Sequence, residues 1–317
     1  MPVHDDLVGR AVNAVLVPPQ AARFAALTGA DLDRLVLNVS GWNKLVLLDR
    51  DRVFLFPRAA AGVEWFEREI AAYRALAETG LTVVPRLLGR WQDPEIYPFP
   101  FAAVTRLPGQ VPAEPEALLD QVGQAIAGWH ELAAPPPLAG ARPPQHHYAA
   151  HHRWLRHALD PATSAAAAAE AASRLSRPDQ AAGWTRLLAR AAQLKPVLVH
   201  GDIHEDQLLA EDGRLTGILD WETVRVDHPF WDFDLGEWGT GLWRRHRGQF
   251  SALWARGWHA YATARGLDPD SRPVETAFRL RQALRLLDDP GDPAIVGTIE
   301  EHLAPLAIPA QNAGASE

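Results

Sequence analysis

Residues 197–222 constrain the fold of this chain more than any other stretch. Three apolar residues, 197–199, lead into a polar cluster, and two further apolar runs follow at 208–210 and 215–219. The turn 211–214, with Asp-Gly at its centre, separates these two runs. Short apolar runs joined by a Gly-containing turn predict a β-hairpin. We therefore expect a strand, a polar loop and a hairpin in direct succession.

The predicted hairpin brings together polar side chains from both of its ends. Gln207 stands at its entry and Asp220 at its exit, while Asp202 precedes Gln207 in the polar loop. Phosphoryl transfer needs hard oxygen ligands for Mg²⁺, which carboxylate and amide oxygens provide. It also needs a carboxylate that orients and deprotonates the attacking hydroxyl. We expect Asp220 and Gln207 to hold the metal and Asp202 to act as the base.

The residues around this hairpin resemble a known family. The matching motif is His200-Gly201-Asp202-Ile203-His204, then Gln207-Leu208-Leu209 and Ile218-Leu219-Asp220-Trp221-Glu222. Its order and spacing are similar to the catalytic and metal segments of the aminoglycoside phosphotransferase family. The continuation over 221–229 and 232–234 resembles the macrolide phosphotransferase subgroup most closely. The resemblance implies an α+β, bilobal protein-kinase-like fold, with a small antiparallel sheet and one helix in the N-lobe and a larger, mainly helical C-lobe.

Within that resemblance, several polar residues support the catalytic loop. His200 corresponds to a position that braces the loop, and Asp232 or Asp234 to one that accepts hydrogen bonds from its backbone. His204 either supports the loop or positions the substrate. The sequence departs from the family at Gln207, where most members have asparagine and macrolide phosphotransferases have histidine. The amide oxygen of glutamine lies one methylene further out and still suits a metal.

Residues after the metal aspartate leave two interpretations open. The acidic residues Glu222, Asp227 and Glu237 either favour an amine-bearing substrate or serve the structure. Trp238 either lines a substrate cleft or packs in the core. Five histidines between 145 and 158 invite a metal site, but no acidic or cysteine ligand accompanies them at fixed spacing. We expect them to line a loop and helix instead.

Three predicted strands, 32–39, 44–48 and 52–56, suit the N-lobe sheet of the resembled fold. The turn Ser40-Gly41 between the first two corresponds to the loop over the nucleotide phosphates. Its single glycine is a weak phosphate signal by itself.

The helix expected at 64–79 carries Glu69, which corresponds to a glutamate that pairs with a basic residue on the third strand. That strand has Leu55 where the family has lysine or arginine. Lys44 or Arg58 therefore has to take over the phosphate contact, or nucleotide binding is weak or lost.

The lobe junction is expected after the strand 101–107, which gives an N-lobe of residues 1–107 that binds nucleotide. The C-lobe, residues 108–317, then carries catalysis and substrate binding. The resemblance implies that main-chain groups of Ala103, Val104 and Arg106 bind the purine. Because side chains do not decide that contact, the donor is left as ATP or GTP. The main C-lobe helices are expected at 115–132, 181–193, 250–264 and 273–287.

Composition narrows the class of protein. The 317 residues carry a formal net charge of −8, which gives a nucleic-acid or anionic-membrane partner no electrostatic support. The absence of cysteine excludes disulfides and a thiol nucleophile. No apolar run approaches the roughly 18 residues of a membrane span, and the first residues do not form a secretory signal. We therefore expect a cytoplasmic enzyme, and the sequence indicates no protein partner.

These observations predict a small-molecule O-phosphotransferase. It would use Mg²⁺ to move the γ-phosphate of ATP or GTP to a hydroxyl of an antibiotic-like substrate, of macrolide or aminoglycoside type. One alternative is a pseudokinase-like protein that binds a ligand without phosphotransfer, because Leu55 and Gln207 depart from the family. A housekeeping sugar or amino-alcohol kinase is the other.

Overall fold

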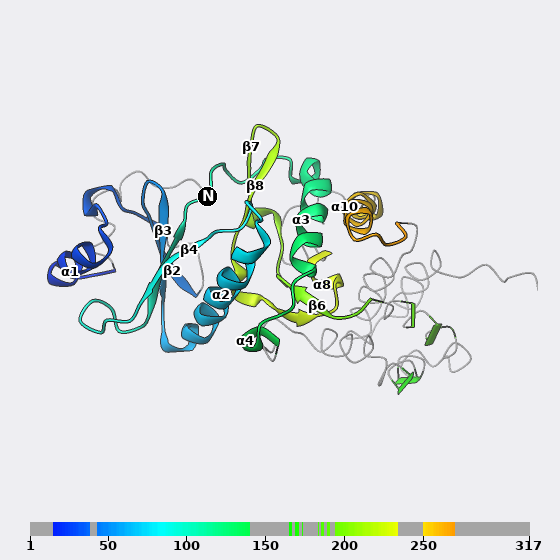
Figure 1. Cartoon of the computed structure of the whole chain (residues 1–317), viewed down its shortest axis with the longest axis horizontal. Helices are drawn as coiled ribbons and strands as arrows, with labels where there is room; N and C mark the ends of the chain where they lie inside the picture. Colours follow the sequence, from blue (N-terminus) through cyan, green and yellow to red (C-terminus); the bar gives the residue numbers. More distant parts are fainter. Residues whose placement is uncertain are drawn as a thin grey trace, which may run out of the picture.

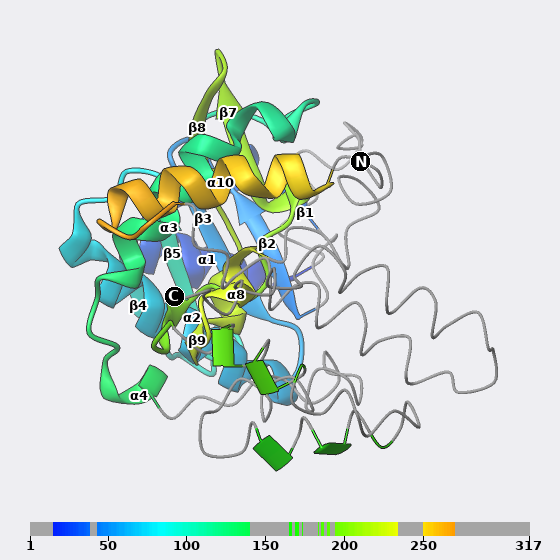
Figure 2. The ribbon, with the colours of Figure 1, turned by 90° about the vertical axis from the view of Figure 1, so that its right-hand side faces the viewer.

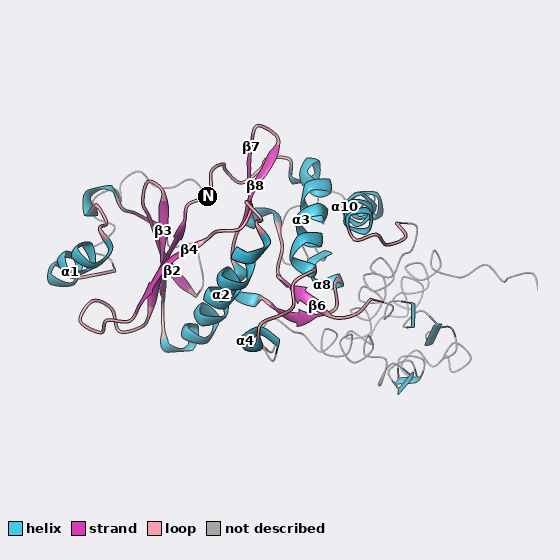
Figure 3. Cartoon of the chain, viewed as in Figure 1, coloured by secondary structure: helices cyan, strands magenta, loops and turns pink. Residues whose placement is uncertain are grey.

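A five-stranded antiparallel sheet forms one end of the described part of the molecule, and helices with two short pairs of strands form the rest of it (Figures 1 and 3). The computed structural model describes residues 15–38, 43–139, 194–233 and 250–269, with a few short helical pieces between 165 and 190. This arrangement confirms the expected α+β, protein-kinase-like fold. None of the described helices is long and apolar enough to cross a membrane.

The strand order in the sheet is β1-β2-β3-β5-β4. The strands are β1 (Val36–Asn38), β2 (Lys44–Leu48), β3 (Arg52–Pro57), β4 (Leu87–Trp91) and β5 (Phe101–Thr105). The first strand is shorter than expected, because Leu32–Arg34 forms a 3-10 turn that Asp31 caps by accepting from the backbone of Asp33.

The two faces of this sheet bury two different cores. Val46 lies opposite Leu55, and both belong to the larger core, which continues into the C-lobe. Leu47 lies opposite Phe54 on the other face, where Phe24 of helix α1 (Pro18–Thr28) packs edge-on against Phe54. Burial on both faces fixes the register, since a shift by one residue would exchange the two sets of side chains.

Helix α2 (Val63–Leu76) packs on the face of the sheet that carries Leu55. Its buried side includes Phe66, Glu69 and Tyr73, while Trp65 is only half-buried. A 3-10 turn, Ala77–Thr79, follows, and Gly80 ends it in the left-handed conformation at φ 71°. The helical segment therefore ends at Thr79, where the sequence predicts.

The described part of the C-lobe combines four α-helices with two small pairs of strands. Helix α3 (Leu119–His130) follows a 3-10 turn at Pro115–Leu118, and α10 (Phe250–Ala264) lies across it (Figure 2). The remaining elements are α4 (Pro136–Ala139), β6 (Val197–Val199), β7 (Leu208–Glu211), β8 (Arg214–Ile218), β9 (Arg225–Asp227) and α8 (Phe230–Phe233). Strands β7 and β8 form the predicted hairpin, and β6 pairs with β9.

The segment between the lobes is bonded to this hairpin. Gln110 and Ala210 exchange two backbone hydrogen bonds of 3.0 and 2.8 Å, and the hydroxyl of Thr216 donates to the carbonyl of Pro108 at 2.6 Å. Gly109 has φ 96°, and a β-carbon there would lie 2.6 Å from the carbonyl oxygen of Ala210. Only glycine fits this close approach of two chains.

Several expectations lie outside the described residues. They are the helix at 273–287, the histidine-rich segment and the residues Ser40, Gly41, Asp234, Glu237 and Trp238. The helix at 181–193 is described only in isolated pieces. The boundary after residue 107 stays a prediction.

Candidate active site

The hairpin places Gln207 and Asp220 next to each other, as the sequence predicts. Leu208 pairs with Ile218, and the backbone amide of Leu219 donates to the carbonyl of Gln207 at 2.9 Å. Asp220 follows Leu219 directly. The side chain of Gln207 is 5% exposed, and its oxygen Oε1 has no hydrogen-bond partner among the described residues. A buried amide oxygen without a partner is costly in an apolar setting and suits a metal ligand.

Asp220 adopts an uncommon backbone conformation. Its φ and ψ are 67° and 58°, in the left-handed region that only a few per cent of non-glycine residues occupy. Strain of this kind costs on the order of 1–3 kcal/mol and persists where the surroundings hold the residue in place. The conformation turns the chain sharply from β8 into the 3-10 turn Trp221–Thr223, so that Asp220 and Glu222 both reach the N-lobe.

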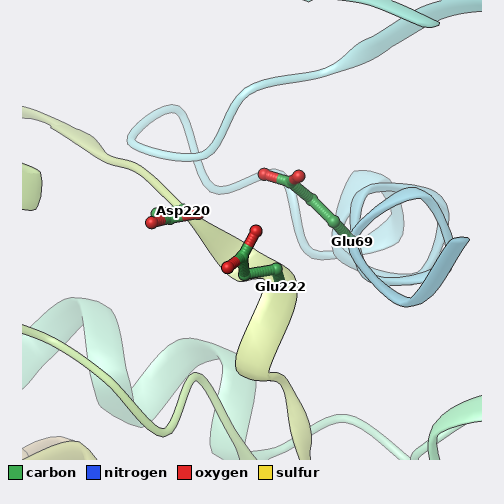
Figure 4. A group of neighbouring side chains, drawn as sticks. All are labelled: Glu69, Asp220 and Glu222. Atoms are coloured by element: carbon green, nitrogen blue, oxygen red, sulfur yellow. The ribbon is translucent and has the colours of Figure 1, made fainter. Parts of the chain in front are cut away.

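Three carboxylates from both lobes, those of Glu69, Asp220 and Glu222, lie close together (Figure 4), and one ammonium group binds all three. Nζ of Lys44 lies 2.7 Å from Oε2 of Glu69, 2.7 Å from Oδ1 of Asp220 and 3.1 Å from Oε2 of Glu222. The second oxygen of Glu69 accepts from the hydroxyl of Tyr73 at 2.7 Å. Lys44 is only 8% exposed. The cluster joins the second strand, helix α2 and the segment after the hairpin.

The charges in this cluster depend on one another. Burial by itself would lower the pKa of Lys44, but Asp220, Glu69 and Glu222 raise it well above its usual value. Burial would raise the pKa of Asp220, yet the Lys44 ammonium brings it below its usual value. The pKa of Glu69 is raised by burial despite Lys44. Lys44 is therefore charged and Asp220 is ionised near neutral pH.

The sheet register explains why Lys44 can replace a lysine at Leu55. Residues directly opposite in an antiparallel pair share a face, and alternate residues of a strand share a face. Val46 lies opposite Leu55, so Lys44 shares the face of Leu55, toward α2. Arg58 has the opposite parity to Leu55, and its Nε donates to the backbone carbonyl of Lys44 at 3.1 Å. Of the two candidates, Lys44 is the one that reaches Glu69.

Asp232 organises the loop that contains Asp202. Its fully buried carboxylate accepts hydrogen bonds from the backbone amides of His200 at 3.1 Å and Gly201 at 2.7 Å. It also accepts from Nε1 of Trp129 at 2.8 Å and lies 2.9 Å from Nε2 of His130. Burial would raise the pKa of Asp232, but the bond from His130 and the other donors lower it.

His200 connects this loop to the metal segment. Nε2 of its buried ring lies 2.9 Å from the carbonyl oxygen of Leu219, and the ring packs edge-on against Trp221. Asp202 follows in the same loop, partly exposed. His204 is half-buried, and its Nδ1 atom has no hydrogen-bond partner among the described residues. The geometry of the loop is thus fixed at His200 and Gly201, directly before Asp202.

Two of the acidic residues that follow Asp220 in the sequence accept hydrogen bonds from other residues of the protein. Asp227 accepts from Nε of Arg225 at 2.9 Å and from the backbone amide of His228 at 2.9 Å. Glu222 accepts from Nδ2 of Asn43 at 2.7 Å. Both residues are at most 9% exposed, which favours the structural alternative over a role as substrate acids.

The backbone expected to bind the purine already makes contacts within the protein. Strand β5 pairs with β3 and β4 on its two edges, at both Ala103 and Val104. The amide of Arg106 donates to the carbonyl of Asp51 at 3.0 Å, and its Nη1 donates to the carbonyl of Asp49 at 2.7 Å. The purine contact at these residues therefore stays a prediction.

Sequence reasoning missed two residues of the site. His130, within the helix expected at 115–132, is a buried partner of Asp232. Asn43 contacts Glu222 across the lobes. Neither has a local signal, because their partners stand 102 and 179 residues away in the sequence.

The donor set at the hairpin fits Mg²⁺. Glu69, Asp220 and Glu222 offer carboxylate oxygens within 4.8 Å of one another, a spacing that also allows a metal ion. The Lys44 ammonium already binds those oxygens, so the three carboxylates bind the lysine rather than a metal ion. The free oxygen of Gln207 and the remaining oxygen of Asp220 are the atoms that suit the metal.

Comparison with known proteins agrees with this geometry. A model of the phosphotransferase enzyme family matches residues 31–287. The chain belongs to that family. The expected enzyme class, a phosphotransferase with an alcohol group as acceptor, and the resemblance to aminoglycoside phosphotransferases are thereby confirmed. No curated protein sequence matches the chain.

Solved structures of this family share the fold at low sequence identity. The macrolide 2'-phosphotransferase MphH from Brachybacterium faecium is 21% identical, with a TM-score of 0.55 over 90% of this chain and 97% of that one. The ADP-bound aminoglycoside phosphotransferase APH(2'')-Ib is 14% identical, with a TM-score of 0.54 over 91% and 97%. A GDP complex of aminoglycoside 2'-phosphotransferase-IIIa is 16% identical, with a TM-score of 0.54 over 90% and 96%.

Proposed function

We propose that this phosphotransferase moves the γ-phosphate of ATP or GTP to a hydroxyl of an antibiotic-like small molecule, of macrolide or aminoglycoside type. The observation that carries the proposal is the ion pair of Lys44 with Glu69 and Asp220. It supplies a buried, charged lysine on the correct face of the sheet, although Leu55 occupies the family position. Such a reaction in the cytoplasm would give antibiotic resistance.

Each polar residue of the site has a role in this proposal. Lys44 binds the nucleotide phosphates, while Asp220 and the amide oxygen of Gln207 hold Mg²⁺, which neutralises phosphate charge when bound. Asp202 orients the acceptor hydroxyl and takes its proton. Asp232 and His200 hold the loop so that Asp202 is already in place, and most of the rate would come from such positioning.

The similar proteins support a nucleotide donor and an antibiotic-like acceptor, but they do not decide between ATP and GTP or between a macrolide and an aminoglycoside. Structures with ADP and with GDP both occur among them, which fits a nucleotide donor of either base. Complexes among them contain streptomycin, gentamicin or kanamycin, and MphH is a macrolide 2'-phosphotransferase. We favour a macrolide because residues 221–229 resemble that subgroup.

A pseudokinase-like ligand-binding protein was the alternative from another class. The first observation in its favour was that Leu55 stands where the family has a lysine, but Lys44 offers a lysine in reach of Glu69. The second observation was Gln207, but its buried oxygen has no partner and suits a metal ligand. A housekeeping sugar or amino-alcohol kinase would use the same catalytic residues, so the acceptor screen has to separate it from an antibiotic kinase.

Two measurements test the proposal. ATP and GTP, each with and without Mg²⁺, should raise the melting temperature only when Mg²⁺ is present. Asp202→Asn should keep that shift and lose turnover on macrolides and aminoglycosides. Unchanged turnover in this variant would remove Asp202 from its role, and the absence of any nucleotide shift would return the weight to the pseudokinase alternative.

A further inference from the structure

We propose that Glu222 is a positioning residue that holds Lys44, and the strand end that carries it, in place for phosphate binding. The inference rests on the proposed function, because it assumes that Lys44 contacts the nucleotide. It assigns to Glu222 a role in binding the donor, instead of the role in binding an amine-bearing acceptor that the sequence left open.

Glu222 uses its two oxygens on two consecutive residues of the other lobe. Oε1 accepts from Nδ2 of Asn43 at 2.7 Å, and Oε2 lies 3.1 Å from Nζ of Lys44. Glu222 itself belongs to the 3-10 turn that begins directly after Asp220. One side chain therefore fixes the start of β2 relative to the metal segment.

The strand end benefits from such an anchor because Lys44 is the first residue of β2. Lys44 lies opposite Pro57, the last residue of β3, in a pair that carries no backbone hydrogen bond of its own. The adjacent pair carries the bond, from the amide of Arg58 to the carbonyl of Asn43 at 2.8 Å. A lysine at position 55 would sit inside the sheet, between β2 and β5, and would not depend on this end.

The three carboxylate contacts of Lys44 differ in kind. A lysine ammonium has three donors, and Glu69 and Asp220 each take one at 2.7 Å. Oε2 of Glu222 is close enough for charge attraction but accepts no hydrogen bond from any described residue. The contact with Glu222 is the longest of the three, so Glu222 holds the ammonium mainly by charge attraction.

The first test is Glu222→Gln in the full-length protein. The variant keeps the size of the side chain and removes its charge. We expect the dissociation constants of Mg·ATP and Mg·GTP, measured by calorimetry, to rise about tenfold, which is the effect of losing one charged contact of about 1.4 kcal/mol. Glu78→Gln removes the same charge at an exposed position and should leave both constants unchanged.

The decisive test is whether Glu222 acts through Lys44. In a Lys44→Met background, Glu222→Gln should weaken nucleotide binding no further, because the group it positions is gone. An independent tenfold loss in that background would overturn the proposal and leave a structural role. Unchanged nucleotide binding in Glu222→Gln, or a higher KM for the acceptor alone, would overturn it as well.

A second variant covers the case in which Glu222→Gln fails to fold. Asn43→Ala keeps all charges and removes only the anchor of Oε1, so it should weaken nucleotide binding several-fold, while an unchanged affinity would contradict the proposal. If the wild-type protein itself binds no nucleotide with Mg²⁺, the proposed function fails and this inference with it. Wild-type binding with unaffected variants refutes the inference alone.

Discussion

Replacing Lys44 by methionine should destabilise the protein strongly, even without any ligand. Lys44 is 8% exposed and Glu69 is 1% exposed, so the change leaves buried carboxylates without their cation. Removing one partner of a buried ion pair costs about 3–5 kcal/mol. Because Asp220 keeps part of its side chain in solvent, we expect the lower end of this range. At about 2–4 °C per kcal/mol, the melting temperature should fall by roughly 6–12 °C.

The pH dependence of this loss follows from Glu69. Burial already raises the pKa of Glu69 in the wild-type protein, and without Lys44 it should rise further. When folding raises the pKa of a carboxyl group, that group stabilises the folded protein at pH values below its pKa in the unfolded chain, about 4.3. This stabilisation is lost as the pH rises through the pKa of the group in the folded protein. The loss of stability in Lys44→Met should therefore be largest at pH 8 and become smaller toward pH 5.

Thermal unfolding by circular dichroism measures both effects. Lys195→Met is the matched control, because Lys195 is exposed just before β6 and loses the same charge and side chain. Equal melting temperatures for Lys44→Met and the wild-type protein at pH 8 would refute the reasoning, since the ammonium would then not be the counter-ion of the three carboxylates. A deficit that does not change with pH would refute the part assigned to Glu69.

Three further predictions follow from other contacts. Gln207→Leu should leave the melting temperature nearly unchanged and raise the Mg²⁺ concentration for half-maximal activity roughly tenfold, because the lost oxygen has no partner inside the described protein. Burial lowers the pKa of His130 despite its bond to Asp232; stability should thus fall as the pH drops below about 6.5, the unfolded value, and calorimetry should show a smaller fall in His130→Gln. Gly109→Ala should cost about 1–3 kcal/mol in urea unfolding, because its β-carbon would meet the Ala210 carbonyl at a positive φ.

The hairpin was predictable because its signals are local. The apolar runs and the Asp-Gly turn lie within 208–219, and the structure places the strands at Leu208–Glu211 and Arg214–Ile218. The neighbourhood of Gln207 and Asp220 follows from this register alone. No contact with a distant part of the chain was needed for that part of the site.

The choice of Lys44 over Arg58 depended on a register that the sequence contains in principle. The short connection between β2 and β3 fixes their pairing, and the parity of the two strands then puts Lys44 on the face of Leu55. The ion pair itself requires α2 to pack on that face, which the sequence indicates only through the family resemblance. The bond between Asn43 and Glu222 depends on how the lobes meet, and no local pattern encodes that contact.

Asp232 also makes the assembly of the catalytic loop part of the folding of the whole C-lobe. Trp129, which donates to its carboxylate, stands 103 residues earlier in the chain. Contacts that close such long loops form slowly and late in folding. The amides of His200 and Gly201 donate to the same buried carboxylate. Their hydrogen exchange should therefore require cooperative opening of the C-lobe rather than local fraying. A C-lobe that is only partly folded would then have no working loop, and the protein would lose activity and global structure in a single transition.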